Sequence, residues 1–273
     1  MNIPNTTLAD GIEIPQLGFG TWQVPPADTA AVVDEALRAG YRHIDTAQMY
    51  QNEAGVGEAL RTSGLARDEV FVTTKCNNSS HGFDGAIAAL ETSLGLLGLD
   101  YVDLYLIHWP QPSRDQYVDT WRGFVELKQR GLTRSIGVAN FHTPYLERII
   151  AQTGVTPSVN QIELHPYLTQ ERAVAESRKL GVAIESWSPL ASGEALDDPV
   201  ISQIAEAHGK SVAQTVIRWH LQLGYIVIPK SVTPARIAAN IDVFDFELTP
   251  EEILRISELN DDARTGPDPA DLG

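Results

Sequence analysis

The sequence has 273 residues, of which 43% are hydrophobic and 21% charged, which is the composition of a globular protein with enough apolar material for a core. The formal net charge of −16 disfavours nucleic acid and anionic membrane surfaces as partners, because the field of the protein would repel both. The single cysteine, Cys76, excludes an internal disulfide, and no apolar run is long enough to predict a transmembrane helix.

The first residues of the chain predict a cytoplasmic protein with a small hairpin. Met1 to Gly11 lacks the basic and then apolar pattern of a secretion signal, so we expect the chain to stay in the cytoplasm. Residues 7–14 alternate between apolar and polar side chains and are interrupted by Asp10-Gly11, a dipeptide that suits a tight turn. We therefore expect an N-terminal β-hairpin.

After the hairpin, short apolar runs alternate with longer amphipathic stretches, which is the pattern of parallel βα units. Strands are predicted at residues 18–20, 42–46, 70–75, 102–108, 135–139, 159–164, 183–188 and 225–229. Helices are predicted between and after them at residues 29–39, 53–62, 83–97, 117–129, 144–151, 171–180, 212–223 and 236–240, and a further helix is expected to end at Gly209. Eight βα units in this length favour one (β/α)8 TIM-barrel domain that spans residues 1–273.

An open, doubly wound sheet is the alternative architecture. It would carry a glycine-rich dinucleotide fingerprint between a strand and a helix. Gly18-Phe-Gly20 lacks the third glycine of that motif, and Gly55 and Gly57 lie inside a predicted helix. The closed barrel is therefore preferred.

Two segments depart from the alternating pattern. Residues 191–199 form a polar loop after the seventh strand, and residues 261–273 form a tail rich in proline, glycine and aspartate. Ligands of such barrels bind at the carboxyl ends of the strands. We expect the loop and the tail to lie over that mouth.

Four polar residues lie at or just after the ends of consecutive predicted strands: Asp45, Tyr50, Lys75 and His108. A buried Lys75 requires a compensating carboxylate, and Asp45 on the neighbouring strand is the expected partner. A cation beside Tyr50 stabilises the phenolate and lowers the pKa of the hydroxyl, so that Tyr50 can act as an acid. His108 is placed to orient a substrate oxygen.

Other interpretations of these residues remain open at this point. Asp45 and Lys75 could form a structural ion pair, and His108 could be a core histidine. Lys75 could instead be the Schiff-base nucleophile of a barrel aldolase. A metal hydrolase built on His108, Glu163 and His165 is a further alternative, although no close metal-ligand motif occurs and we expect no metal.

The order of motifs resembles the aldo-keto reductase family over essentially the whole chain. The matching segments are Leu17-Gly-Phe-Gly-Thr-Trp22, Gly40-Tyr-Arg-His-Ile-Asp-Thr-Ala47 with Tyr50, Thr73-Thr-Lys75, Asp103-Leu-Tyr-Leu-Ile-His-Trp-Pro110, Ile136-Gly-Val-Ala-Asn-Phe141, Asn160-Gln161, Trp187-Ser-Pro-Leu190 and Ile228-Pro-Lys-Ser231. The last third is most similar to the bacterial branch that contains 2,5-diketo-gluconate reductases, on His208-Gly-Lys210, Arg218-Trp-His-Leu-Gln222 and Asp242-Val-Phe-Asp-Phe-Glu-Leu248.

The resemblance implies a monomeric enzyme that uses NADPH to reduce small aldehydes or ketones, including dicarbonyls and keto-sugars, with Tyr50 as the proton donor. It places the nicotinamide carboxamide on Asn140 and Gln161, the nicotinamide ring on Trp187, and the pyrophosphate along Ser188, Leu190 and Ser192. It places the adenosine 2′-phosphate on Lys230, Ser231 and Arg236, the adenine beside Asn240, and the substrate against Trp22 and Trp109.

Three positions depart from the family pattern. Ala139 replaces a serine that helps to hold the carboxamide, and Ala239 replaces a glutamate that often contacts adenine. Cys76-Asn77 replaces a common Leu-Trp pair, which implies a smaller and more polar pocket wall. Because some relatives are regulatory subunits that bind the cofactor without turnover, that role is a second possible function for this chain.

Overall fold

The structure, a computed structural model, describes residues 3–272 and contains one sheet of eight parallel strands. Its order is β10-β9-β8-β7-β6-β5-β4-β3, so every strand lies beside its neighbour in the chain. The strands are β3 (Phe19–Gly20), β4 (His43–Asp45), β5 (Phe71–Cys76), β6 (Val102–Ile107), β7 (Thr133–Ala139), β8 (Val159–Glu163), β9 (Ala183–Trp187) and β10 (Ile226–Val227). All eight predicted strands are present.

The first and last strands meet, which closes the barrel. Leu17 and Val227 form a parallel bridge. The amide of Gly18 donates to the Val227 carbonyl at 2.9 Å, and the amide of Val227 donates to the Gln16 carbonyl at 2.9 Å. The predicted (β/α)8 TIM barrel is therefore confirmed, with parallel strands throughout.

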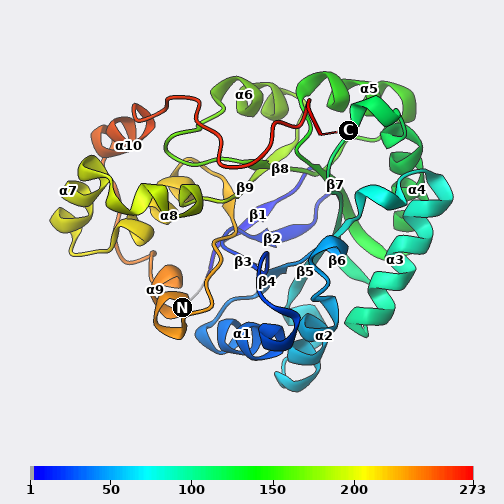
Figure 1. The fold of residues 1–273 in the computed structure, drawn as a ribbon, viewed down its shortest axis with the longest axis horizontal. Coiled ribbons are helices and arrows are strands. Elements are labelled where there is room, and N and C mark those ends of the chain that lie inside the picture. The colour runs from blue at the N-terminus through cyan, green and yellow to red at the C-terminus, as the bar shows by residue number, and fades with distance from the viewer. Residues whose placement is uncertain (1–2, 273) are drawn as a thin grey trace.

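Helices surround the sheet on its outer face (Figure 1). They are α1 (Pro26–Ala39), α2 (Glu53–Thr62), α3 (Phe83–Leu97), α4 (Tyr117–Gln129), α5 (Thr143–Thr153), α6 (Glu171–Lys179), α7 (Pro199–His208), α8 (Val212–Gln222), α9 (Pro234–Ile241) and α10 (Pro250–Ser257). The helix expected to end at Gly209 is α7, whereas α10 was not predicted. Within residues 3–272, no helix has the length and apolarity to cross a membrane.

The expected hairpin consists of β1 (Asn5–Thr7) and β2 (Glu13–Pro15), and it covers the amino-terminal end of the barrel. Its Asp10 carboxylate accepts from the hydroxyl of Ser135, which lies near the start of β7, at 2.8 Å. The connection is longer than the predicted tight turn, because Thr7 pairs with Glu13 and only Gly11 of the Asp-Gly pair has a positive φ, of 82°.

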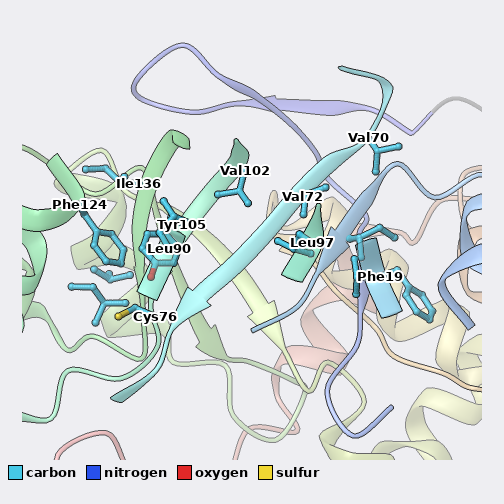
Figure 2. Packing of buried hydrophobic residues seen from close by; sticks show 14 of the residues in the cluster. Phe19, Val70, Val72, Cys76, Leu90, Leu97, Val102, Tyr105, Phe124 and Ile136 are labelled. Carbon is cyan, nitrogen blue, oxygen red and sulfur yellow. The ribbon is translucent and has the colours of Figure 1, made fainter. Parts of the chain in front are cut away.

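Outward-facing strand side chains pack against the helices. Phe124, Tyr105 and Leu90 fill the layer between sheet and helices, and Cys76 lies in the same layer (Figure 2). A six-residue strand such as β5 is buried on both faces, because the helices cover its outer side and the barrel interior its inner side. The strand side chains that face the barrel interior can therefore line a site at the carboxyl ends of the strands.

Candidate active site

An ion pair lies inside the mouth of the barrel. Lys75 Nζ is 2.5 Å from Asp45 Oδ1, 2.9 Å from the carbonyl oxygen of Thr46 and 3.4 Å from the Tyr50 hydroxyl. The Lys75 side chain is 0% exposed and that of Asp45 is 2% exposed. A charged pair at this depth is stable only because each charge compensates the other. The structure thus brings together three of the four polar residues singled out in the sequence.

His108 completes the group. Its ring meets the Tyr50 ring edge to face, with centroids 5.6 Å apart and planes at 74°. The imidazole is buried and its Nδ1 has no hydrogen-bond partner among the described residues. All four predicted residues therefore face one mouth, as the strand ends required.

Tyr50 is held by the short 3₁₀ turn η1 (Gln48–Tyr50) that follows β4. Asn52 holds this segment in place through its side-chain amide. Its Oδ1 accepts from the Thr46 hydroxyl at 2.8 Å, and its Nδ2 donates to the Thr21 carbonyl at 2.9 Å. Asn52 is buried, so its amide satisfies backbone groups that water does not reach. The phenol is thereby kept beside Lys75.

The electrostatics of Tyr50 differ in part from the expectation. Burial raises the pKa of the Tyr50 hydroxyl above its ordinary value, and the nearby Lys75 charge lowers it by less than burial raises it. The predicted effect of Lys75 has the right sign, but the predicted net lowering is wrong for the chain without ligands, because loss of hydration outweighs one paired cation. Tyr50 therefore keeps its proton at neutral pH.

Lys75 and His108 are shifted in opposite directions. Burial lowers the pKa of the Lys75 ammonium, but Asp45, Tyr50 and Glu185 together raise it by more, so that the ammonium form persists. Burial and the Lys75 charge hold the pKa of His108 well below 6.5, so the imidazole is neutral. A permanently charged, paired lysine is the opposite of what Schiff-base chemistry requires, which argues against the aldolase alternative.

A second buried carboxyl, which the sequence analysis missed, lies next to this group. Gln161 Nε2 donates at 2.9 Å to Asp45 Oδ2 and at 2.9 Å to Oε2 of Glu185, a residue of β9. Glu185 is 0% exposed, and Gln161 is 2% exposed. The available signal was a lone carboxylate in a predicted strand whose other residues are apolar or serine. Predicted cofactor residue Gln161 is therefore in direct contact with the acid–base group.

The other nicotinamide residues lie at the ends of β7 and β9. Asn140 Nδ2 donates to the His108 carbonyl at 3.0 Å, and its Oδ1 accepts from Trp187 Nε1 at 2.8 Å. Asn140 has a φ of 64°, a left-handed conformation that asparagine tolerates better than most residues. The Oδ1 atom and one Nδ2 hydrogen of Asn140 are thus bonded within the chain, which leaves the second Nδ2 hydrogen without a partner among the described residues.

The loop after β9 is coiled into the 3₁₀ segment η5 (Ala191–Asp197). Ser188 and Ser192, two predicted pyrophosphate residues, have positive φ values of 50° and 55°. The third, Leu190, is half-buried against the core. Left-handed backbone at residues other than glycine is frequent at functional sites, and the pyrophosphate role of this loop stays a prediction.

The predicted 2′-phosphate residues surround the start of α9. Lys230 and Arg236 are exposed, and neither makes an ion pair with any residue in the range 3–272, whereas Ser231 and Asn240 are buried. The Ser231 hydroxyl accepts from the Thr233 amide at 3.1 Å, close to the helix N-terminus. Exposed cations without a carboxylate partner can attract an anion, and the 2′-phosphate role of Lys230 and Arg236 stays a prediction.

Aromatic side chains line the mouth. Trp109 is 9% exposed and lies 6.4 Å, centroid to centroid, from Trp187, whereas Trp22 is 50% exposed. Asn77 also lies at this end and donates its amide to Gln48 Oε1 at 3.2 Å. The inference that Cys76 contributes to the pocket wall is wrong, because Cys76 points outward into the layer between sheet and helices (Figure 2).

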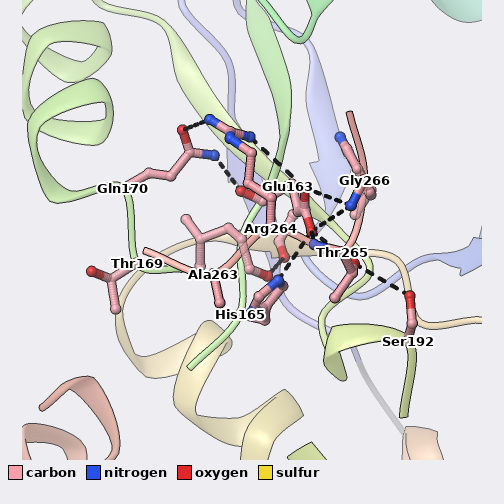
Figure 3. A network of polar contacts seen from close by, with 12 residues as sticks. Glu163, His165, Thr169, Gln170, Ser192, Ala263, Arg264, Thr265 and Gly266 are labelled. Carbon is pink, nitrogen blue, oxygen red and sulfur yellow. Dashed lines mark hydrogen bonds and ion pairs between the residues drawn. The ribbon is translucent and has the colours of Figure 1, made fainter. Parts of the chain in front are cut away.

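The C-terminal tail crosses the mouth and is fixed there by Glu163. Glu163 Oε1 accepts from the Thr265 amide at 2.6 Å, from the Thr265 hydroxyl at 2.7 Å and from the Gly266 amide at 3.2 Å (Figure 3). The Thr265 hydroxyl also accepts from the Ser192 hydroxyl at 3.3 Å. The tail and the loop after β9 are therefore joined, as expected of two segments that cover one ligand.

Glu163 is thus a tail anchor and not a metal ligand. Its neighbour His165 is 3.1 Å away, but among residues 3–272 no group of three or more His, Cys, Asp or Glu side chains is placed to hold a metal ion. The hydrogen bonds of Glu163 to the tail therefore give no support to the metal-hydrolase alternative built on His108, Glu163 and His165.

A cleft of about 790 Å³ lies between the tail, α5 and α6. Its charged side chains have both signs, for example Arg172 and Arg264 against Glu176 and Asp268, and none of the four acid–base residues lines it. We therefore place the functional site at the barrel mouth, where the buried titratable groups converge.

A TIM barrel with a buried acid–base group at its carboxyl end has the architecture of an enzyme. The sequence model described as "Aldo/keto reductase family" matches residues 16–261. An aldo-keto reductase of Mycolicibacterium smegmatis is 54% identical over 266 residues, with 97% of each chain covered. The methylglyoxal reductase DkgA of Yersinia pestis is also 54% identical, over 273 residues, with 99% of this chain and 98% of that protein covered. A crystal structure of a Gox0644 mutant in complex with NADPH is similar with a TM-score of 0.96 at 47% identity, covering 100% of both chains.

The chain belongs to the aldo/keto reductase family, as the motifs in its sequence indicated.

Proposed function

We propose that this chain is an NADPH-dependent reductase of small aldehydes and ketones, with residues 1–273 acting as one domain and Tyr50 as the proton donor. The observation that carries the proposal is the Tyr50 hydroxyl 3.4 Å from Lys75 Nζ, inside a barrel mouth that also holds Asp45 and His108. The NADPH complex of a relative and the relatives named methylglyoxal reductase support the cofactor and a dicarbonyl substrate class.

The residues present suit this cofactor. The exposed cations Lys230 and Arg236 suit the 2′-phosphate, because neither has an acidic partner within residues 3–272. The Gln161 amide has both hydrogens directed at carboxyl oxygens, which leaves its own oxygen for the carboxamide NH₂. Ala139 lies in an apolar cluster and offers no hydroxyl, so we propose that Asn140 and Gln161 hold the carboxamide without a third partner.

When NADPH is bound, its nicotinamide would supply the hydride that adds to the carbonyl carbon. Tyr50 donates its proton to the carbonyl oxygen, and the resulting phenolate is stabilised by the Lys75 ammonium. His108 is neutral, and its Nε2 orients the carbonyl oxygen, since Nδ1 is buried against the protein. Trp22 and Trp109 form an apolar wall for the rest of the substrate.

The test is the substitution Tyr50→Phe. We expect NADPH binding close to that of the wild type and turnover lower by roughly 10²–10⁴-fold, the usual contribution of a positioned general acid. Turnover is measured as NADPH oxidation with methylglyoxal, an aldehyde and a keto-sugar. More than half of the wild-type turnover in the variant would remove Tyr50 from the mechanism.

The regulatory alternative predicts a different result. A chain that binds NADPH but reduces no carbonyl compound of a broad panel would be a cofactor-binding regulatory protein. Borohydride treatment with a ketone tests the aldolase alternative, because it would trap a covalent adduct on Lys75. That the chain is monomeric and cytoplasmic stays a prediction from the sequence.

A further inference from the structure

Glu185 is a buried carboxyl for which the proposed chemistry has no use. It lies on β9 with its side chain inside the barrel and 0% exposed. Its Oε2 accepts from Gln161, but its Oε1 has no hydrogen-bond partner among the described residues, and His43 Nε2 lies 3.6 Å away. Lys75 is already paired with Asp45, so a carboxylate at Glu185 would have no cation of its own.

Gln161 joins this carboxyl to the proposed catalytic group. One amide nitrogen lies 2.9 Å from Asp45 Oδ2 and 2.9 Å from Glu185 Oε2, so both of its hydrogens are used. The amide can satisfy two carboxyl groups only in this orientation. The amide oxygen accepts no hydrogen bond from the described chain, and it therefore points away from the two carboxyl groups.

We propose that Glu185 is a positioning residue that orients the Gln161 amide toward the nicotinamide carboxamide and, through the bridge to Asp45, sets the charge that Lys75 and Tyr50 experience. The inference rests on the proposed function, in which Gln161 holds the cofactor and Tyr50 donates the proton. It adds a fifth polar residue, on a strand that contributes none of the four acid–base side chains.

The charge of Glu185 follows from its surroundings. The groups that face it are His43 and Asp45 of β4, Lys75 of β5 and Gln161 of β8. Burial, together with the Asp45 charge, raises the pKa of Glu185 to about 8. Burial lowers the pKa of His43 to about 3, so that ring is neutral and does not offset a Glu185 charge.

A neutral Glu185 leaves the Lys75 charge available to the Tyr50 phenolate. When Glu185 ionises, its negative charge raises the pKa of Tyr50 and opposes formation of the phenolate. Wild-type Tyr50 therefore retains its proton further into the alkaline range than it would beside an uncharged side chain.

Two substitutions separate the two actions. Glu185→Gln removes the charge but keeps an oxygen that accepts from Gln161, so we expect wild-type affinity for NADPH and an alkaline limit of kcat that moves down by about half a pH unit to one unit. Glu185→Leu also removes the acceptor, so we expect NADPH to bind about tenfold more weakly. Affinity is measured by tryptophan fluorescence, and kcat by methylglyoxal reduction between pH 6 and pH 10.

A third measurement does not depend on turnover. The folded-state pKa of Glu185 lies above its unfolded value, so its contribution to stability is present below about pH 4.5 and is lost as pH rises through about 8. The melting temperature of Glu185→Gln should therefore rise relative to that of the wild type as pH increases over this interval. This comparison needs only the folded Gln variant, and it remains informative if the Leu variant does not fold.

The proposal is overturned if Glu185→Gln has the wild-type alkaline limit and the wild-type pH dependence of melting, or if a folded Glu185→Leu variant binds NADPH with wild-type affinity. Tyr50→Phe is measured in parallel. High turnover in that variant removes the proposed proton donor, whereas the NADPH affinities and the melting curves still decide the role of Glu185.

Discussion

Lys75 directs its ammonium group at three oxygen atoms of the barrel: a carboxylate, a carbonyl and the Tyr50 hydroxyl. Because the ammonium is fully buried, its charge is weakly screened by solvent, and it acts on Tyr50 over a short distance. Asp45 keeps that charge in place. The pair is therefore both a structural element and the electrostatic partner of the proposed proton donor.

Lys75→Met should abolish most activity. Without the cation the pKa of Tyr50 rises further, since burial then acts without an opposing charge, and the phenolate that forms after proton transfer is no longer stabilised. The measurement is kcat against pH, with Lys128→Met as the control, because Lys128 pairs with Asp10 of the hairpin instead. A variant with the wild-type rate and pH profile would contradict this role of Lys75.

Asp45→Asn should lower stability, because it leaves the buried Lys75 without its charge partner. Removal of one partner of a buried pair costs about 3–5 kcal/mol. Urea unfolding of the variant and the wild type measures the difference. Wild-type stability would mean that other groups, such as Glu185, compensate the lysine.

Acid should destabilise the fold through its buried, neutral histidines, among them His43 and His220. Burial lowers the pKa of His43 to about 3 and that of His220 to about 4. As pH falls below about 6.5, the unfolded chain binds protons that the folded chain does not, so stability decreases down to about pH 3. His43→Gln should reduce the fall in melting temperature between pH 7 and pH 4, whereas His142→Gln, at a partly exposed histidine, should not.

Single residues were the scale at which the sequence was least informative. Asp45, Tyr50, Lys75 and His108 could be predicted because each lies at or just after the end of a strand, where barrels carry their chemistry. Glu185 could not, because one carboxylate among apolar residues and serine has no pattern of its own. Its partner Gln161 is known only after the strands are paired.

Among the elements, the tail shows how a segment without periodicity acquires a fixed place. A Cβ atom added to Gly266 would lie 2.5 Å from Trp187 Cη2, so the tail backbone is packed directly on the indole that is proposed to contact the nicotinamide. Arg264 adds an ion pair with Glu163 at 3.8 Å (Figure 3). Tail, indole and loop after β9 form one covering layer.

Thr265→Val should loosen this layer, because it removes a hydroxyl that bonds both Glu163 and Ser192. We expect the KM for the carbonyl substrate to be about three- to tenfold higher, which corresponds to the free energy of about one hydrogen bond. We also expect faster proteolysis in the tail. Thr265→Ser keeps the hydroxyl and is the matched control. If both variants behave alike, the hydroxyl does not hold the tail.

The predicted elements agree with the structure where long apolar or amphipathic patterns exist, as in α3 and β6. Helix α10 was missed although Thr249 and Glu252 form a capping box with Pro250 at the first helical position. The predicted strand at residues 225–229 shortens to Ile226–Val227, because the barrel closes there through only a few backbone bonds. Pattern length thus decides what the sequence reveals about an element.

At the scale of the whole molecule, the distribution of charge determines which ligands can approach. The chain has 36 acidic and 20 basic residues, and most of the basic side chains form ion pairs such as Arg67 with Asp103 or Lys210 with Asp245. Lys230 and Arg236 do not, within residues 3–272. An anionic ligand bound there, as proposed, would be attracted locally by two exposed cations although the overall field opposes it.

Arg236→Ala tests whether that site recognises the 2′-phosphate that distinguishes NADPH from NADH. A charge-assisted hydrogen bond contributes about 1.5–3 kcal/mol, so the variant should bind NADPH about ten- to a hundredfold more weakly, with little change for NADH. Higher salt should reduce the NADPH preference of the wild type, because Arg236 is exposed and its charge is screened. Both cofactors are titrated against tryptophan fluorescence, with Arg255→Ala, at a surface arginine of α10 that bonds Gln203, as the control. Equal losses for NADH and NADPH would show that Arg236 acts on the adenine or on the fold, and the 2′-phosphate would then have to be bound elsewhere.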